Sequence, residues 1–159
     1  MPGITVITVG TLKESYLKDA VDEYKKRLSQ YARVDEINIK EEKISNEDDL
    51  SEIKRALDTE GDKILQAIPK GAEKFALCVE GVQYDSPGLA KVIEKASDEC
   101  GKIALIIGSS HGLSEKVKKE CKIRLSFSKL TFPHQLMRVI LFEALYRSFT
   151  ILAGKKYHK

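Results

Sequence analysis

A run of five apolar residues that stops at a glycine-rich loop limits this chain to few architectures. Residues 103–107 are Ile-Ala-Leu-Ile-Ile, and residues 108–112 are Gly-Ser-Ser-His-Gly. A strand that is apolar on both faces is typical of the centre of a parallel sheet covered by helices. Parallel neighbours require long crossover connections, so strands and helices should alternate along the chain.

The remaining sequence supports an alternating α/β domain. Strand-like stretches occupy residues 4–9, 33–39, 75–79 and 123–127, and segments of helical periodicity occupy residues 16–31, 50–68, 86–100, 114–121 and 133–152. Ser45 and Asp48 have capping-box spacing near the second helix, and Ser86 is the expected N-cap of the third. We predict one domain over residues 1–159 with a largely parallel sheet. Its ligand crevice should lie beyond the carboxyl ends of the strands.

Composition excludes several classes of protein. A chain of 159 residues can bury one core without staples, and its three cysteines, Cys78, Cys100 and Cys121, are far apart and odd in number. Neither a disulfide framework nor a metal site is therefore expected. No stretch approaches the roughly 20 apolar residues of a membrane span, and the first residues lack the regions of a signal peptide. We expect a cytoplasmic protein.

Charge is distributed unevenly. The net charge is only +3, but residues 101–159 hold 12 Lys and Arg against 3 Asp and Glu, whereas residues 1–100 hold 15 against 21. A basic C-terminal third indicates a surface that faces a polyanion such as RNA. A solvated basic helix face explains the same charge equally well.

Three predicted strand ends would meet at the crevice, at residues 77–81, 107–112 and 127–132. Gly108 and Gly112 allow the backbone to approach a ligand closely or to adopt a positive φ. The three spaced glycines of a dinucleotide site are absent, which argues against a small nucleotide-dependent reductase.

The segment 125–139 joins a hydroxyl-rich loop to a helix. Ser128 and Thr131 offer hydrogen-bonding groups for a ligand, although ordinary turn chemistry is the simpler interpretation. His134 could be a base or a ligand, but a histidine at a helix start is more often a capping or packed residue. Arg138 is a better candidate for holding a phosphate or a developing anion, with a surface ion pair as the alternative.

The last helix and the tail after it suggest a partner. Apolar residues occupy two faces of residues 133–152, separated by the polar pairs His134 with Arg138 and Glu143 with Arg147. We predict that a second subunit covers one of these faces; burial within one larger core is the alternative. The final residues, Tyr157-His158-Lys159, combine a stacking ring, an imidazole and a cation, which suits RNA, although a disordered tail is common at termini.

Five segments together resemble one known family. They are residues 9–13, the pair Glu80-Gly81, residues 107–114, the block Leu-Ser-Phe-Ser-Lys-Leu-Thr-Phe-Pro-His-Gln-Leu at 125–136, and the ending at 157–159. Over essentially the whole chain, the sequence closely resembles the large-subunit ribosomal RNA pseudouridine N3-methyltransferases of the SPOUT superfamily.

The resemblance implies an α/β fold with a deep C-terminal trefoil knot, an obligate homodimer and S-adenosylmethionine as cofactor. Two departures from the family pattern are Ser109, where a second glycine is usual, and Lys155-Lys156, where Glu-Pro is common. By the same resemblance, the cofactor contacts are Leu77, Gly108, Phe127, Ser128, Lys129, Leu130, Thr131 and Phe132.

A catalytic scheme follows from the implied substrate. The imide N3 is weakly acidic, so it must lose its proton before it can accept a methyl group. We expect His158 to act as the base, with direct proton loss to water as the alternative, while Arg138 stabilises the imide anion and Tyr157 stacks on the RNA. A non-catalytic ribosome-binding α/β module is the alternative function.

Overall fold

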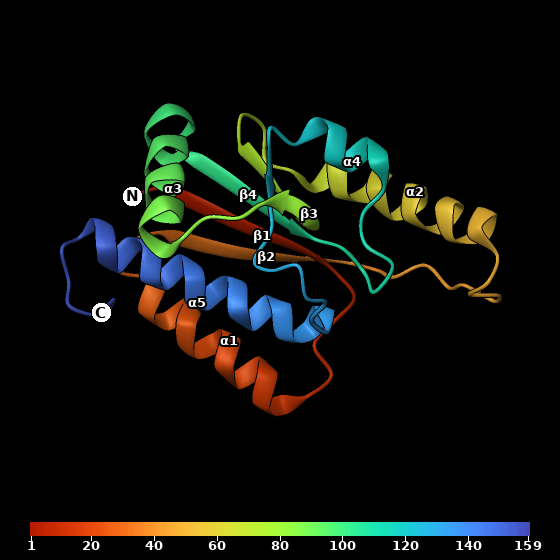
Figure 1. Ribbon diagram of the computed structural model, residues 1–159, viewed down its shortest axis with the longest axis horizontal. Helices are drawn as coiled ribbons and strands as arrows, with labels where there is room; N and C mark the ends of the chain where they lie inside the picture. Colours follow the sequence, from red (N-terminus) through yellow and green to blue (C-terminus); the bar gives the residue numbers. More distant parts are fainter.

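Five parallel strands form the middle layer of the protein in a computed structural model that describes residues 1–159 (Figure 1). Their order in the sheet is β2-β1-β4-β3-β5, so the apolar strand β4 is central, as predicted. The strands are β1 (Gly3–Val9), β2 (Arg33–Ile39), β3 (Glu73–Val82), β4 (Lys102–Ile107) and β5 (Ile123–Leu125).

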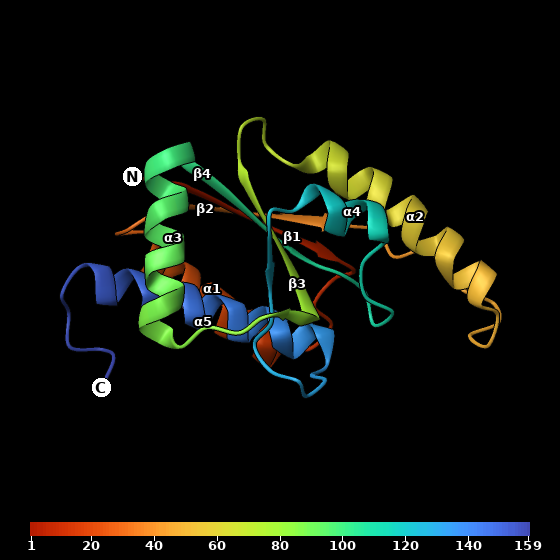
Figure 2. The same ribbon diagram turned by 45° about the horizontal axis from the view of Figure 1, so that its top comes forward.

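Helices cover both faces of this sheet (Figures 1 and 2). On one face lie α1 (Ser15–Leu28), α3 (Ser86–Cys100) and α5 (His134–Leu152). On the other face lie α2 (Leu50–Ala67) and α4 (Glu115–Glu120). The predicted α/β class and parallel sheet are confirmed. The trefoil knot implied by the resemblance stays a prediction.

Side-chain alternation along β4 explains its uninterrupted apolar sequence. Ile103 and Leu105 are fully buried in the core beneath α1, α3 and α5, whereas Ile106 is fully buried in the second core beneath α2 and α4. Each such side chain contributes roughly 1.5–3 kcal/mol by burial. A polar residue at any of these positions would lose that contribution.

Two helix starts differ from the predictions. Asp49, rather than Ser45 or Asp48, caps α2 by accepting hydrogen bonds from the N–H groups of Ser51 and Glu52. Ser45 instead donates its hydroxyl to Glu52, 2.7 Å away. Likewise, Asp85, rather than Ser86, caps α3. In both cases a neighbouring aspartate supplies the acceptor that serine was expected to supply.

The faces of α5 are unequal. Leu141, Phe142 and Leu145 are buried in the core, whereas Leu136 is 39 % exposed and Ile140 is half-buried. A partly exposed stripe therefore runs along the helix, as the two-faced sequence predicts. No helix in the structure combines the length and the apolar character needed to span a membrane.

Candidate functional site

A cavity of about 680 Å³ opens at the carboxyl ends of β3, β4 and β5. Its walls come from residues 77–80, 107–113 and most of 125–134, and Lys118 and Met137 complete them. This volume lies within the roughly 300–1,000 Å³ that is usual for small-molecule and cofactor sites. The three strand-end segments expected at the crevice therefore lie around one cavity.

Most of the expected cofactor-binding residues are brought together here. Lys129 does not line the cavity, and its side chain is exposed. The residues that do line it are Leu77, Gly108, Phe127, Ser128, Leu130, Thr131 and Phe132.

The loop after β4 is tight because its backbone folds onto itself. A Cβ atom at position 108 would collide with the carbonyl oxygen of Gly112. The positive φ in this loop, +90°, belongs to Gly112; Gly108 has none, so its requirement for glycine is steric. Ser109 is buried, and its hydroxyl accepts the His111 N–H at 3.3 Å, so a serine at this position stabilises the turn.

Serine hydroxyls hold the loop after β5. Ser126 donates to the carbonyl oxygen of Ser128 at 3.0 Å, and the Ser128 hydroxyl accepts the Leu130 N–H at 3.0 Å. Leu130 itself is 70 % exposed beside the cavity. Turn chemistry and cavity lining therefore occur in the same residues, and the two interpretations of this segment are compatible.

An ion pair that sequence reasoning missed lies at the cavity wall. Lys118 of α4 donates to the Glu80 carboxylate at 2.6 Å, and this hydrogen bond lowers the pKa of Glu80. His134, which was disfavoured as a site residue, also lines the cavity. Lys118 and Glu80 are 38 residues apart in the sequence, so no local sequence pattern predicts their ion pair.

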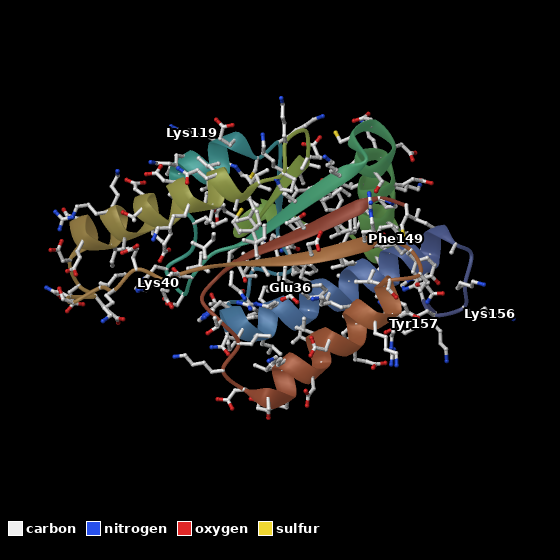
Figure 3. All side chains as sticks on the ribbon, turned by 180° about the vertical axis from the view of Figure 1, so that it is seen from behind. Glu36, Lys40, Lys119, Phe149, Lys156 and Tyr157 are labelled. Carbon is white, nitrogen blue, oxygen red and sulfur yellow. The ribbon has the colours of Figure 1, made fainter.

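Arg138 lies away from the cavity lining. Its side chain is only 2 % exposed, and it donates to the carbonyl oxygen of Gly10 at 3.1 Å and to Asn38 Oδ1 at 3.3 Å. Burial lowers the pKa of Arg138, while the carboxylate of Glu36, which lies between β2 and α5 in Figure 3, opposes that shift. Arg138 thus joins α5 to the loop that follows β1 and to the carboxyl end of β2.

The C-terminal tail is packed against α5. The Tyr157 hydroxyl donates to Glu143 at 3.1 Å, and the Tyr157 ring meets Tyr146 edge-on with centroids 4.8 Å apart. The guanidinium of Arg147 lies 4.7 Å from the Tyr157 ring centre and 3.2 Å from Nδ1 of His158. Burial, together with the Glu143 carboxylate, raises the pKa of Tyr157 to about 12. Its phenol therefore stays protonated at neutral pH.

The tail and the cavity lie at opposite ends of α5 within one chain. His134 lines the cavity, whereas the tail contacts Arg147, about 20 Å further along the helix axis at 1.5 Å per residue. Figure 1 shows the chain ending beside the amino-terminal side of the sheet, away from the cavity loops. A single chain therefore does not bring Tyr157 and His158 to the cofactor-binding residues.

Part of the basic charge in the C-terminal third is neutralised by ion pairs within the chain. Lys116 pairs with Asp62 at 2.8 Å, Lys118 pairs with Glu80, and Lys122 approaches Glu73 at 3.8 Å. The lysines without an ion pair that lie beside the cavity loops and in the tail are Lys129, Lys155, Lys156 and Lys159. These four remain available for an external anion.

Comparisons with known proteins bear on the family and the fold of this chain. A family model described as "Predicted SPOUT methyltransferase" matches residues 3–158. Two relatives named "Ribosomal RNA large subunit methyltransferase H", from Caldicellulosiruptor saccharolyticus and Shouchella clausii, are 43% and 46% identical, each covering 98% of this chain and 99% of the relative. The crystal structure of a probable methyltransferase from Bordetella pertussis superposes with a TM-score of 0.61, covering 92% of this chain and 93% of that one. Its 14% identity makes it evidence for the fold alone.

Proposed function

This chain belongs to the SPOUT methyltransferase family, and on that premise we propose that it methylates N3 of a pseudouridine in large-subunit ribosomal RNA, using S-adenosylmethionine. The observation that carries the proposal is the single cavity at the ends of β3, β4 and β5. The names of the relatives support the RNA substrate.

The cavity residues fit the proposed cofactor. S-adenosylmethionine would supply a methyl group already activated by its sulfonium. Gly108 leaves the space that a side chain would fill against Gly112, and Leu77 and Phe127 offer apolar walls for an adenine ring. The backbone of residues 127–132, ordered by the Ser128 hydroxyl, would hydrogen-bond to the edge of the adenine.

The tail is proposed to act on the RNA. Loss of the N3 proton makes the imide nucleophilic, and accurate positioning can remove roughly 7–11 kcal/mol of a bimolecular barrier. Tyr157 and His158 would position the target base, and the proton would pass to His158 or directly to water. Arg138 would contribute by holding the Gly10 loop against α5, and Lys129 would contact phosphate.

A homodimer is proposed because one chain separates the tail from the cavity. The partly exposed stripe of α5 has Leu136 and Ile140 near the cavity end and Arg147 at the tail end. If two copies pack these stripes antiparallel, the tail of each approaches the cavity of the other. The complete site would then contain residues from both chains.

Titration calorimetry of the purified protein separates this proposal from the alternatives. A methyltransferase should bind S-adenosylmethionine and not NADH, whereas a small reductase should bind NADH. A non-catalytic ribosome-binding module should bind ribosomal RNA and neither cofactor. Transfer of labelled methyl groups from S-adenosylmethionine to ribosomes then distinguishes catalysis from binding. An absence of both cofactor binding and transfer would rule out the proposal.

A further inference from the structure

One carboxylate oxygen organises the C-terminal end of α5. Oε1 of Glu143 accepts hydrogen bonds from Arg147 Nη2 at 2.6 Å, from Arg147 Nε at 3.1 Å and from the Tyr157 hydroxyl at 3.1 Å. Both side chains of the Glu143–Arg147 pair are less than 30 % exposed. Glu143 thus fixes the guanidinium and the phenol relative to each other.

Arg147, held in this way by Glu143, also contacts His158. With Nε and Nη2 directed at Glu143, its remaining nitrogen Nη1 lies 3.2 Å from Nδ1 of His158, and its plane lies over the Tyr157 ring. A guanidinium has only donors, so Nδ1 must be the acceptor in this contact. In a neutral imidazole whose Nδ1 accepts a hydrogen bond, the ring proton resides on Nε2.

We propose that Glu143 and Arg147 are positioning residues that hold His158 as the Nε2–H tautomer, so that the imidazole is a hydrogen-bond donor to the substrate. The inference rests on the proposed function and deepens it. A donor at Nε2 suits the carbonyl oxygens of a uracil-type imide, where negative charge gathers as N3 loses its proton. Because Nε2 already bears a proton, His158 held in this way cannot receive the imide proton there. That proton passes to water.

The chain offers a matched control for a simple surface ion pair. Glu23 and Arg27 on α1 have the same i,i+4 spacing, a 2.9 Å hydrogen bond and an aromatic ring beneath the guanidinium. Arg27 has no hydrogen bond to the tail. Effects of losing an Arg–Glu ion pair should therefore follow substitution of either pair. Effects on His158 should follow only from substitution of Glu143 or Arg147.

The test measures the tautomer and the reaction separately. ¹⁵N NMR of histidine-labelled full-length protein, with His158 assigned by its disappearance in His158→Gln, should show Nε2 protonated and Nδ1 unprotonated at pH 8. Glu143→Ala, Arg147→Met and Arg147→Lys should lose this signature, because none retains the fork that joins Glu143 to His158. Glu23→Ala should keep it. In the three variants, kcat should fall at least about tenfold, whereas affinity for S-adenosylmethionine should be unchanged.

The outcomes separate this inference from the proposed function. If His158 has its proton on Nδ1 in the parent, or if the three variants keep both the parental spectrum and the parental kcat, the inference is wrong even though the enzyme is active. If the parent shows the expected tautomer but transfers no methyl group to ribosomes, the proposed function fails. In that case Arg147 would still position His158, but this contact would have no role in methyl transfer.

Discussion

Gly108 is the residue on which the shape of the cavity most depends. We predict that Gly108→Ala weakens S-adenosylmethionine binding at least about tenfold, because the added Cβ collides with the Gly112 carbonyl and displaces the loop. Calorimetry on the folded variant measures this. Gly3→Ala is the matched control, since a Cβ there meets only ordinary contacts near 3.8 Å. Parental affinity in Gly108→Ala would place the cofactor elsewhere.

Glu60 is a buried carboxylate whose effect on stability depends on pH. It is 3 % exposed and accepts the Glu42 N–H at 2.9 Å, and burial raises its pKa. The folded state therefore binds a proton more readily than the unfolded chain, whose glutamate pKa is about 4.3. Stability attributable to this group must fall as pH rises above that value.

Glu60→Gln should consequently raise the melting temperature at pH 8, with the difference shrinking toward pH 4. Glu52→Gln should have the opposite effect, because hydrogen bonds from Ser45 lower the pKa of Glu52 and favour its charged form in the folded state. Thermal unfolding of the parent and of both variants at pH 4 and at pH 8 measures these differences. A Glu60→Gln variant that is less stable at pH 8 than at pH 4, relative to the parent, would contradict the assignment.

Among the structural elements, the C-terminal tail should be dispensable for folding. We predict that deleting residues 157–159 leaves S-adenosylmethionine affinity unchanged but slows methyl transfer by roughly 5- to 150-fold or more, the equivalent of about 1–3 kcal/mol of lost stacking. The cavity that is expected to hold the cofactor lies at the far end of α5 from these residues. Deleting Lys159 alone separates the loss of its charge from the loss of the ring and the imidazole. Cofactor affinity lost with the tail would mean that the tail belongs to the cavity.

The elements were predictable from the sequence because their signals are local. The apolar run of β4 identifies it as a buried strand, and the periodicity of α5 identifies it as a helix. The predicted ends of both elements lie within a few residues of the observed ones. The caps of α2 and α3 were misassigned because several adjacent side chains could accept the same N–H groups. The predicted strands also indicated where the three cavity loops lie, since parallel strands have their carboxyl ends at one edge of the sheet.

Contacts between distant segments were not predictable in this way. Arg138 reaches Gly10 across 128 residues, and Lys118 reaches Glu80 across 38. The same holds for the tail, because nothing in Tyr157-His158 indicates that Glu143 and Arg147 will bind it. Helical spacing put Glu143 and Arg147 side by side but could not say which other residues they contact.

The proposed site requires two chains, because the tail and the cavity of one chain lie apart. We predict a dimer in sedimentation at micromolar concentration and a monomer for the double variant Leu136→Glu/Ile140→Glu, which places charge on the partly exposed stripe of α5. The monomer should still bind S-adenosylmethionine but should not methylate ribosomes. Leu50→Glu, at a 79 % exposed apolar position on α2, should remain dimeric and active. A parental protein that is monomeric and active would refute the two-chain site.

Mass mapping of large-subunit ribosomal RNA tests the proposed reaction itself. RNA from cells that lack the gene should contain one unmethylated pseudouridine, and incubating their ribosomes with the purified protein and S-adenosylmethionine should add 14 Da to that nucleoside, at N3. The Gly108→Ala variant should add little under the same conditions. A ribosomal RNA whose modifications are identical with and without the gene, and unchanged by the protein, would contradict the proposed reaction.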